Sequence, residues 1–127
     1  MKELTGKTPS IHICDKSKGI WEAVMDTGIS SFSIDNVKDI GEAKQIMGHK
    51  ITIMGNVPPV DVMQKGTRSD VLAHAKRCIK RAYDSEKGYI LSSGCQIPIN
   101  SPIENVEALM DAVRMYGSYP INEEFFI

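Results

Sequence analysis

Three side chains of the metal-binding type stand out in this sequence. His12 and Cys14 lie two residues apart in Ser10-Ile11-His12-Ile13-Cys14, and Cys95 ends the segment Ser92-Ser93-Gly94-Cys95. Because side chains alternate between the two faces of a strand, His12 and Cys14 are expected to point to the same side. Imidazole and thiolate together suit zinc, and catalytic zinc sites commonly use three protein ligands and leave a position for substrate or water. The three residues therefore predict an open zinc site.

A structural role is the alternative for residues of this kind. A buried cysteine is commonly a small core side chain, and a strand histidine can simply form a hydrogen bond within the protein. Cys78 fits that description, because it lies on an apolar helical stripe with Ala75 and Ile79, and we expect it in the core. His49 and His74 are expected to be solvated histidines without a role.

The elements that must position the three residues follow a regular alternation. Four short runs rich in β-branched residues, at residues 10–14, 31–34, 50–54 and 88–91, predict strands. Each is followed by a run of helical periodicity. The apolar positions of these runs are Ile20, Trp21, Val24 and Met25; Val37, Ile40, Ala43, Ile46 and Met47; Val71, Leu72, Ala75, Cys78, Ile79, Ala82 and Tyr83; and Val106, Leu109, Met110, Val113 and Tyr116.

Two of the helices have clear start signals. Thr67 is placed to cap the third helix, with Asp70 at the third helical position. The fourth helix is expected to begin at Ser101-Pro102-Ile103-Glu104, with Ser101 as the N-cap, Pro102 at the first helical position and Glu104 completing a capping box.

Strands and helices that alternate at this spacing predict an α/β fold of four βα units with parallel strands and right-handed crossovers. A complete (β/α)8 barrel typically needs about 250 residues, and this chain has 127. The expectation is therefore a small open sheet or one half of a barrel, forming a single domain over residues 1–127 with an apolar tail at about 120–127. A half barrel leaves two unpaired strand edges and an apolar inner face, so a homodimer or a complementary half-barrel is expected.

Composition narrows the possible partners and the compartment. The chain is 42% hydrophobic and 24% charged, with a formal net charge of −1. This balance gives no electrostatic basis for binding nucleic acid or an anionic membrane. No apolar run approaches the roughly 20 residues that span a bilayer, and the first residues lack the apolar stretch of a secretory signal. We expect a cytoplasmic protein whose three cysteines are free thiols or metal ligands.

Several short stretches together resemble the uroporphyrinogen decarboxylase superfamily, and within it the zinc-dependent methylcobamide:thiol methyltransferases. They occur in order from Ser10 to about Tyr119 and as a set are quite specific. The stretches are Ile11-His12-Ile13-Cys14, Ser33-Ile34-Asp35, Ile53-Met54-Gly55-Asn56-Val57-Pro58-Pro59, Lys65-Gly66-Thr67, Leu91-Ser92-Ser93-Gly94-Cys95-Gln96-Ile97-Pro98 and Ser101-Pro102-Ile103-Glu104-Asn105.

The resemblance implies a (β/α)8 barrel of which this chain is the carboxyl-terminal half. It also implies that His12, Cys14 and Cys95 bind Zn²⁺, and that the zinc presents a thiol such as coenzyme M to the methyl group of a corrinoid carried by a partner protein. The amino-terminal half of the family pocket is missing from this sequence, so activity of the chain alone is doubtful.

Four further residues are candidates for binding substrate. Asp35 is expected to be a polar wall of the pocket or the cap of the next helix, with the cap slightly favoured. Asn56, in an expected Gly55-Asn56-Val57 turn, is as suited to a local turn bond as to donating to substrate. Ser93 and Gly94 lie beside Cys95 in the loop that follows the last strand.

Two other functions remain open at this stage. One is porphyrin decarboxylation, but that branch of the superfamily resembles a pattern with Gly-His-Gly where this chain has Gly94-Cys95-Gln96. The other is a non-catalytic half-barrel fragment that only self-associates through its exposed edges.

Overall fold

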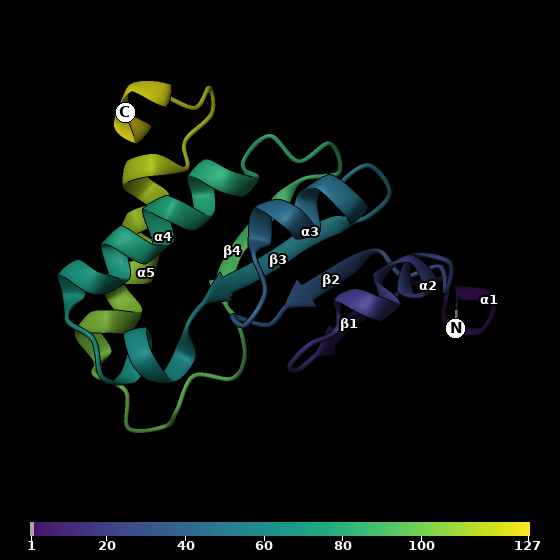
Figure 1. Ribbon diagram of the computed structural model, residues 1–127, viewed down its shortest axis with the longest axis horizontal. Helices are drawn as coiled ribbons and strands as arrows, with labels where there is room; N and C mark the ends of the chain where they lie inside the picture. The colour runs from purple at the N-terminus through teal and green to yellow at the C-terminus, as the bar shows by residue number, and fades with distance from the viewer. Residues whose placement is uncertain (1) are drawn as a thin grey trace.

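A four-stranded parallel sheet forms the centre of the molecule (Figure 1). The computed structural model describes residues 2–127. Its strands are β1 (Ser10–Ile13), β2 (Ser31–Ile34), β3 (Thr52–Val57) and β4 (Tyr89–Ser93), hydrogen-bonded in the order β1-β2-β3-β4. All three pairings are parallel. The predicted α/β fold with four βα units is thus confirmed, and β1 and β4 are the open edges of the sheet.

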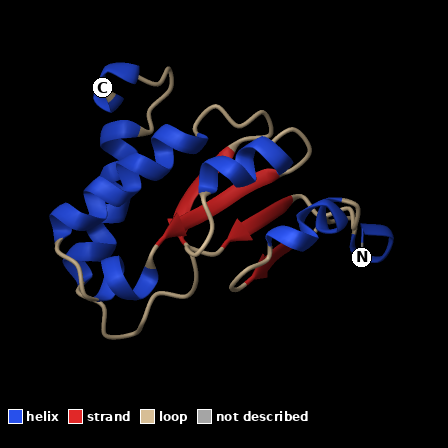
Figure 2. Ribbon diagram, in the orientation of Figure 1, coloured by secondary structure: helices blue, strands red, loops and turns tan. Residues whose placement is uncertain are grey.

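The helices follow the strands in the predicted alternation (Figure 2). They are α2 (Trp21–Met25), α3 (Ile40–Met47), α4 (Arg68–Ala82) and α5 (Ile103–Tyr116), and α4 and α5 lie side by side (Figure 1). Shorter helical segments that the sequence pattern did not indicate are α1 (Lys2–Thr5), a 3₁₀ turn at Lys18–Ile20, a π-helix at Pro59–Gln64 and a 3₁₀ turn at Glu123–Phe126. Among residues 2–127, no helix is both long and apolar enough to cross a bilayer.

The hydrophobic core lies between the sheet and its helices. Trp21 from α2, Phe32 from β2 and Ile53 from β3 are fully buried there. On the edge strand β1, Ile11 and Ile13 pack against this core, whereas His12 between them is exposed. The alternation of a strand therefore directs His12 to the face opposite the core.

The helix starts were predicted correctly in one case and wrongly in the other. Thr67 caps α4 as predicted, and the structure shows that Thr67 and Asp70 together form a capping box. Ser101 does not cap α5, because Pro102 has an extended backbone and itself occupies the N-cap position, with its carbonyl accepting from the Asn105 amide at 3.0 Å. Ser101 is one residue too early to reach the first turn, and within residues 2–127 its buried hydroxyl has no partner.

Strand β3 extends further than the alternation of residues suggested. It runs to Val57, so Gly55 and Asn56 lie within the strand and the predicted turn at this position is wrong. Gly55 has a φ of +131°, and a Cβ atom there would meet the Ile34 carbonyl oxygen at 2.8 Å. Only glycine fits both the backbone conformation and the close approach to β2.

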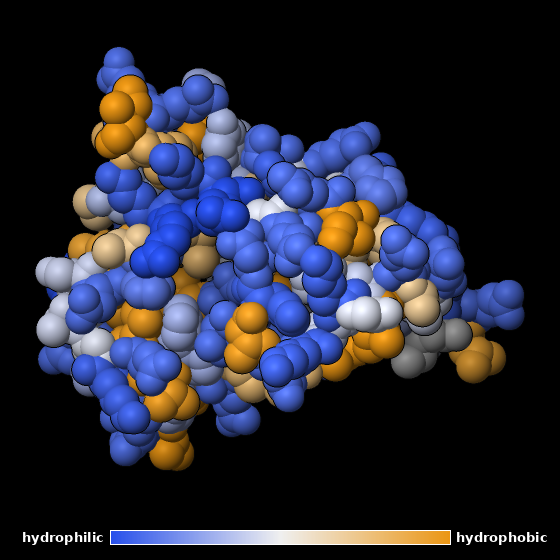
Figure 3. Space-filling model, in the orientation of Figure 1, coloured by the Kyte–Doolittle hydropathy of each residue, from blue (hydrophilic) through white to orange (hydrophobic). Residues whose placement is uncertain are grey.

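The apolar tail docks on the last turns of α4. Phe126 is buried, its ring stacks on Tyr83 with centroids 6.0 Å apart, and Lys80 Nζ donates to the Phe126 carbonyl oxygen at 2.8 Å. Cys78 is buried in the core, as expected. Several apolar side chains remain exposed on α5, including Ile103 and Met110, and apolar side chains are interspersed among polar ones on the face shown in Figure 3.

Candidate metal centre

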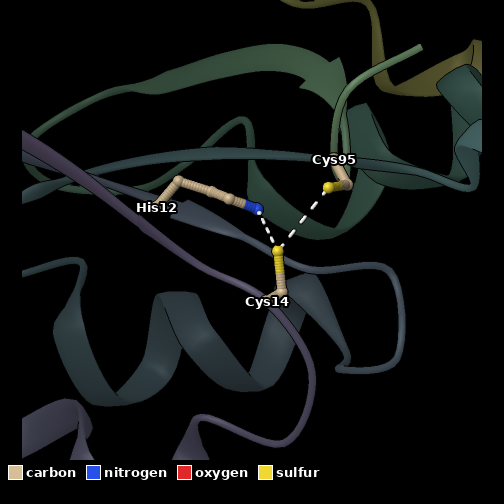
Figure 4. Close-up of side chains that lie close together, drawn as sticks. All are labelled: His12, Cys14 and Cys95. Atoms are coloured by element: carbon tan, nitrogen blue, oxygen red, sulfur yellow. Dashed lines mark hydrogen bonds between the residues drawn. The ribbon is translucent and has the colours of Figure 1, made fainter. Parts of the chain in front are cut away.

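The three predicted metal ligands converge at the carboxyl end of the sheet (Figure 4). His12 Nε2 lies 3.2 Å from Cys14 Sγ, and Cys14 Sγ lies 3.6 Å from Cys95 Sγ. All three ligand atoms lie within 4.8 Å of one another. Residues separated by 81 positions in the chain are thus brought into one cluster.

Strand geometry explains this convergence. His12 lies on β1, Cys14 directly follows that strand, and Cys95 lies two residues beyond the end of β4. Parallel strands end at the same edge of a sheet, which is where α/β proteins carry their functional groups. His12 and Cys14 are exposed and Cys95 is half-buried, so an ion held by them would be open to a further ligand.

Two distances between the donor atoms are compatible with a zinc ion. Tetrahedral zinc with Zn–S bonds of about 2.3 Å and Zn–N bonds of about 2.0 Å separates two sulfur ligands by about 3.8 Å and a sulfur and a nitrogen by about 3.5 Å. The observed distances of 3.6 Å between the sulfurs and 3.2 Å between Cys14 Sγ and His12 Nε2 are close to these values. An imidazole and two thiols also form a donor set that zinc prefers.

Ser33 orients the histidine ring. In the parallel register His12 lies opposite Ser33 of β2, and His12 Nδ1 lies 3.1 Å from the Ser33 carbonyl oxygen and 3.0 Å from its Oγ. Donation from Nδ1–H to that carbonyl leaves the lone pair on Nε2, the atom nearest Cys14, free for a metal. Ser33 was not among the predicted site residues. Only the pairing register of β1 with β2 could have identified it.

The two thiols influence each other. The hydrogen bond with Cys95, followed by desolvation and by the negative charges of Asp35 and Asp15, raises the pKa of the Cys14 thiol above its ordinary value. Two neighbouring thiolates repel each other when no cation is bound, which favours the protonated thiol. A bound cation favours the thiolate instead, because a thiol that coordinates a metal is deprotonated.

Asp35 stabilises the segment that follows Cys14. It is buried, its Oδ2 accepts from the Asp15 amide at 2.9 Å and its Oδ1 accepts from the Val37 amide at 3.1 Å. Asp15 has a positive φ of 66°, so this bond secures an unusual backbone conformation next to Cys14, a predicted ligand. The favoured prediction that Asp35 caps the next helix is wrong, because Asp39 is the N-cap of α3.

The loop that carries Cys95 is held by its own neighbours. Ser93 Oγ donates to the Cys95 carbonyl oxygen at 2.6 Å. Gly94 is buried against the loop that follows β2, and a Cβ atom there would meet the Asn36 amide nitrogen at 2.5 Å. Both residues therefore have a structural reason to be present, and the role toward substrate proposed for Ser93 and Gly94 stays a prediction.

Asn56 uses its amide within the protein. It is buried, and its Nδ2 donates to the Asp35 carbonyl at 3.1 Å and to the Lys38 carbonyl at 2.5 Å. Its Oδ1 accepts from Cys78 Sγ at 3.7 Å. Both amide hydrogens thus hold the loop after β2, and donation from Asn56 to substrate, one of the two alternatives, stays a prediction.

Fold and site together define an α/β protein with a parallel sheet and an open histidine–cysteine cluster at the carboxyl ends of its strands. The sequence matches the family model described as "Uroporphyrinogen decarboxylase (URO-D)" over residues 1–116. The chain belongs to this family.

Individual relatives fall into both branches of the family. The chain is 28% identical over 82% of its length to a methylated-thiol–coenzyme M methyltransferase of Methanosarcina mazei, covering 27% of that protein. It is 28% identical over 84% of its length to a methylcobamide:CoM methyltransferase of Methanosarcina barkeri, covering 30% of it. It is also 26% identical over 98% of its length to a uroporphyrinogen decarboxylase of Coxiella burnetii, covering 35% of it.

Comparison of structures gives the same family. A solved methyltransferase from Methanosarcina mazei superposes with a TM-score of 0.76 at 25% identity, over 88% of this chain and 32% of that one. The chain spans about a third of the length of the proteins that it matches.

Proposed function

We propose that this chain carries the zinc site of a methyltransferase that moves a methyl group from a methylated corrinoid protein to a small thiol such as coenzyme M. The observation that supports the proposal is the zinc-compatible spacing of His12, Cys14 and Cys95. The names of two relatives, a methylated-thiol–coenzyme M methyltransferase and a methylcobamide:CoM methyltransferase, agree with it.

Each residue of the cluster has a defined part in this proposal. The two cysteines and His12 Nε2 would hold the ion, and Ser33 would fix the tautomer and orientation of the imidazole. When bound, zinc would supply Lewis acidity that keeps an acceptor thiol deprotonated at neutral pH. The exposure of His12 and Cys14 leaves room for that thiol to approach.

The proposed transfer is a nucleophilic displacement. The sulfur of the acceptor thiol forms a bond to the methyl carbon while the carbon–cobalt bond of the corrinoid breaks. The electron pair of that bond stays with the cobalt, and the thiol proton has already left to solvent. The site favours this reaction because a thiolate, and not a thiol, is the nucleophile.

We further propose that residues 1–127 form one domain that corresponds to the carboxyl-terminal half of the barrel. Strands β1 and β4 expose unpaired edges, and α5 exposes Ile103, Met110 and Val113. A homodimer or a complementary half-barrel would cover these surfaces. Full activity would then require that second half.

Metal content of the purified chain tests the zinc proposal. Protein purified with reduced thiols and without chelator should contain close to one zinc ion per chain by elemental analysis, and Cys95→Ala should lose most of it. Cys78→Ala is the matched control, because Cys78 is buried in the core and bonds to Asn56. Metal-free wild-type protein would contradict the proposal, as would equal zinc loss in the two variants.

Uroporphyrinogen decarboxylation is the second candidate, and it rests on the family and on the decarboxylase of Coxiella burnetii. The cysteine pair argues for the methyltransferase instead, because decarboxylation of this type needs no metal. A zinc-free preparation that binds a porphyrinogen would favour the decarboxylase.

A non-catalytic, self-associating fragment is the third candidate, supported by the open edges of the sheet. Sedimentation equilibrium addresses this alternative directly. A stable monomer would contradict the idea of self-association through the strand edges, whereas a dimer without zinc would favour the fragment over the enzyme.

A further inference from the structure

A second group of charged side chains lies away from the cysteines, between α4 and the loop that joins β2 to α3. A cavity of about 200 Å³ opens there, and its wall includes four basic residues. These are Lys38, His74, Arg77 and Arg81. In Figure 3 the most hydrophilic side chains of the visible face gather over α4 and its border with α3.

The positive charge of this cavity is only partly balanced. Arg81 is bound to Asp39 through two hydrogen bonds, of 2.8 Å from Nη2 and 3.2 Å from Nε, to the same oxygen. Among the described residues, neither the Arg77 guanidinium nor the Lys38 ammonium forms a hydrogen bond or an ion pair. Two uncompensated cations therefore line one cavity.

The geometry points to a phosphate-binding site in this cavity, and we propose that it holds a phosphate group through Arg77 and Lys38. A guanidinium offers a planar fork of donors that matches phosphate, and an ammonium adds a compact point charge. Two free positive charges suit a dianion better than a carboxylate monoanion. Asp39 does not oppose this, because its carboxylate is already paired with Arg81.

The surrounding backbone gives the cavity a built frame. Lys38 is half-buried, and its carbonyl accepts from Asn56 Nδ2 at 2.5 Å. Arg77 and His74 lie one turn apart on α4. His74, expected from the sequence to have no role, is half-buried beside Arg77. Arg77 and His74 thus extend from α4, and Lys38 extends from the loop after β2 that Asn56 anchors.

The cavity also adjoins the loop that carries Cys95. Asn36 lines the cavity, and its backbone packs directly against Gly94, the residue before Cys95. Asp35, which bonds to the Asp15 amide after Cys14, begins the same loop. A phosphate group bound here would therefore lie behind the loop that supports the cluster. The phosphate proposal does not depend on zinc binding.

Titration of the purified, isotope-labelled chain with inorganic phosphate tests the proposal. Saturable shifts of the Lys38, His74 and Arg77 backbone amides are expected at constant ionic strength maintained with chloride. Arg77→Gln and Lys38→Gln should each weaken phosphate binding about tenfold, the loss expected for one charged hydrogen bond. Acetate should bind more weakly than phosphate.

The matched control is Lys87→Gln, which removes the same charge from an exposed lysine outside the cavity. It should leave phosphate binding unchanged, and so should Cys95→Ala, which separates this site from the metal ligands. Thermal unfolding by circular dichroism verifies that each variant is folded. If Arg77→Gln does not fold, the phosphate affinity of Lys38→Gln tests the proposal.

Three results would overturn the inference. They are the absence of saturable shifts, equal weakening by Lys87→Gln and the two cavity variants, or acetate binding as tightly as phosphate.

Discussion

His12 Nδ1 lies within hydrogen-bond distance of two oxygens of Ser33, the carbonyl oxygen at 3.1 Å and Oγ at 3.0 Å. The two residues are register partners on neighbouring parallel strands. This contact determines which nitrogen of His12 faces Cys14. It makes the outer partner of the histidine, as well as the cysteines, part of the proposed zinc site.

Ser33→Ala should lower zinc affinity about tenfold, at the lower end of the effect of losing an outer-shell partner. The loss is moderate because the Ser33 carbonyl still accepts from Nδ1. Competition with a zinc-sensitive dye would measure it. Ser30→Ala is the control, because Ser30 precedes β2 at the opposite end of the sheet, and an equal loss there would exclude a specific role for Ser33.

Asp35→Asn should reduce the free energy of unfolding by about 1–3 kcal/mol, since a buried charged acceptor of two backbone amides would be replaced by a group with one acceptor. Urea denaturation would measure the change. Asp26→Asn serves for comparison and should cost less than about 1 kcal/mol, because Asp26 pairs with Lys50 at the surface. Similar losses in both variants would contradict the role given to Asp35.

Stability should fall in acid partly through the capping box of α4. Hydrogen bonds from the Thr67 amide and hydroxyl hold the pKa of Asp70 below its ordinary value of 3.8. A carboxyl whose pKa is lowered by folding contributes stability above its unfolded pKa and loses it as the pH falls through its folded pKa. Asp70→Asn should therefore be less stable than wild type at pH 7, and the difference should shrink below about pH 4.

Thermal unfolding of both proteins across this pH range would test the capping prediction. The stability that Asp111 contributes depends on pH in the same direction, because Arg68 and then Arg114 lower its pKa. The comparison with Asp70→Asn is therefore needed to assign the effect. A stability difference that does not depend on pH would contradict the prediction.

Ile53→Ala should cost about 2–5 kcal/mol of unfolding free energy, because Ile53 is fully buried on β3 and its truncation leaves a cavity. Ile99→Ala should change stability by no more than about 0.5 kcal/mol, since Ile99 is fully exposed. Denaturant melts of the two variants make a matched pair. Equal effects would mean that the core does not lie between the sheet and its helices.

Local pattern alone was enough to predict the order of the elements and the α/β class. Apolar alternation and helical periodicity depend on neighbours a few residues away, which is why the strands, α4 and its N-cap at Thr67 could be predicted. The same alternation placed His12 opposite Ile11 and Ile13. Because parallel strands end at one edge, it also placed Cys95 near the pair.

The tertiary structure decided what depends on contacts between distant segments. The bond from His12 to Ser33 follows from strand register, and the carboxylate of Asp35 is taken by amides before and after it in the chain. The continuation of β3 through Asn56 and the N-cap at Pro102 also differ from local expectation. Each depends on which backbone groups meet in space, and sequence periodicity carries no information about that.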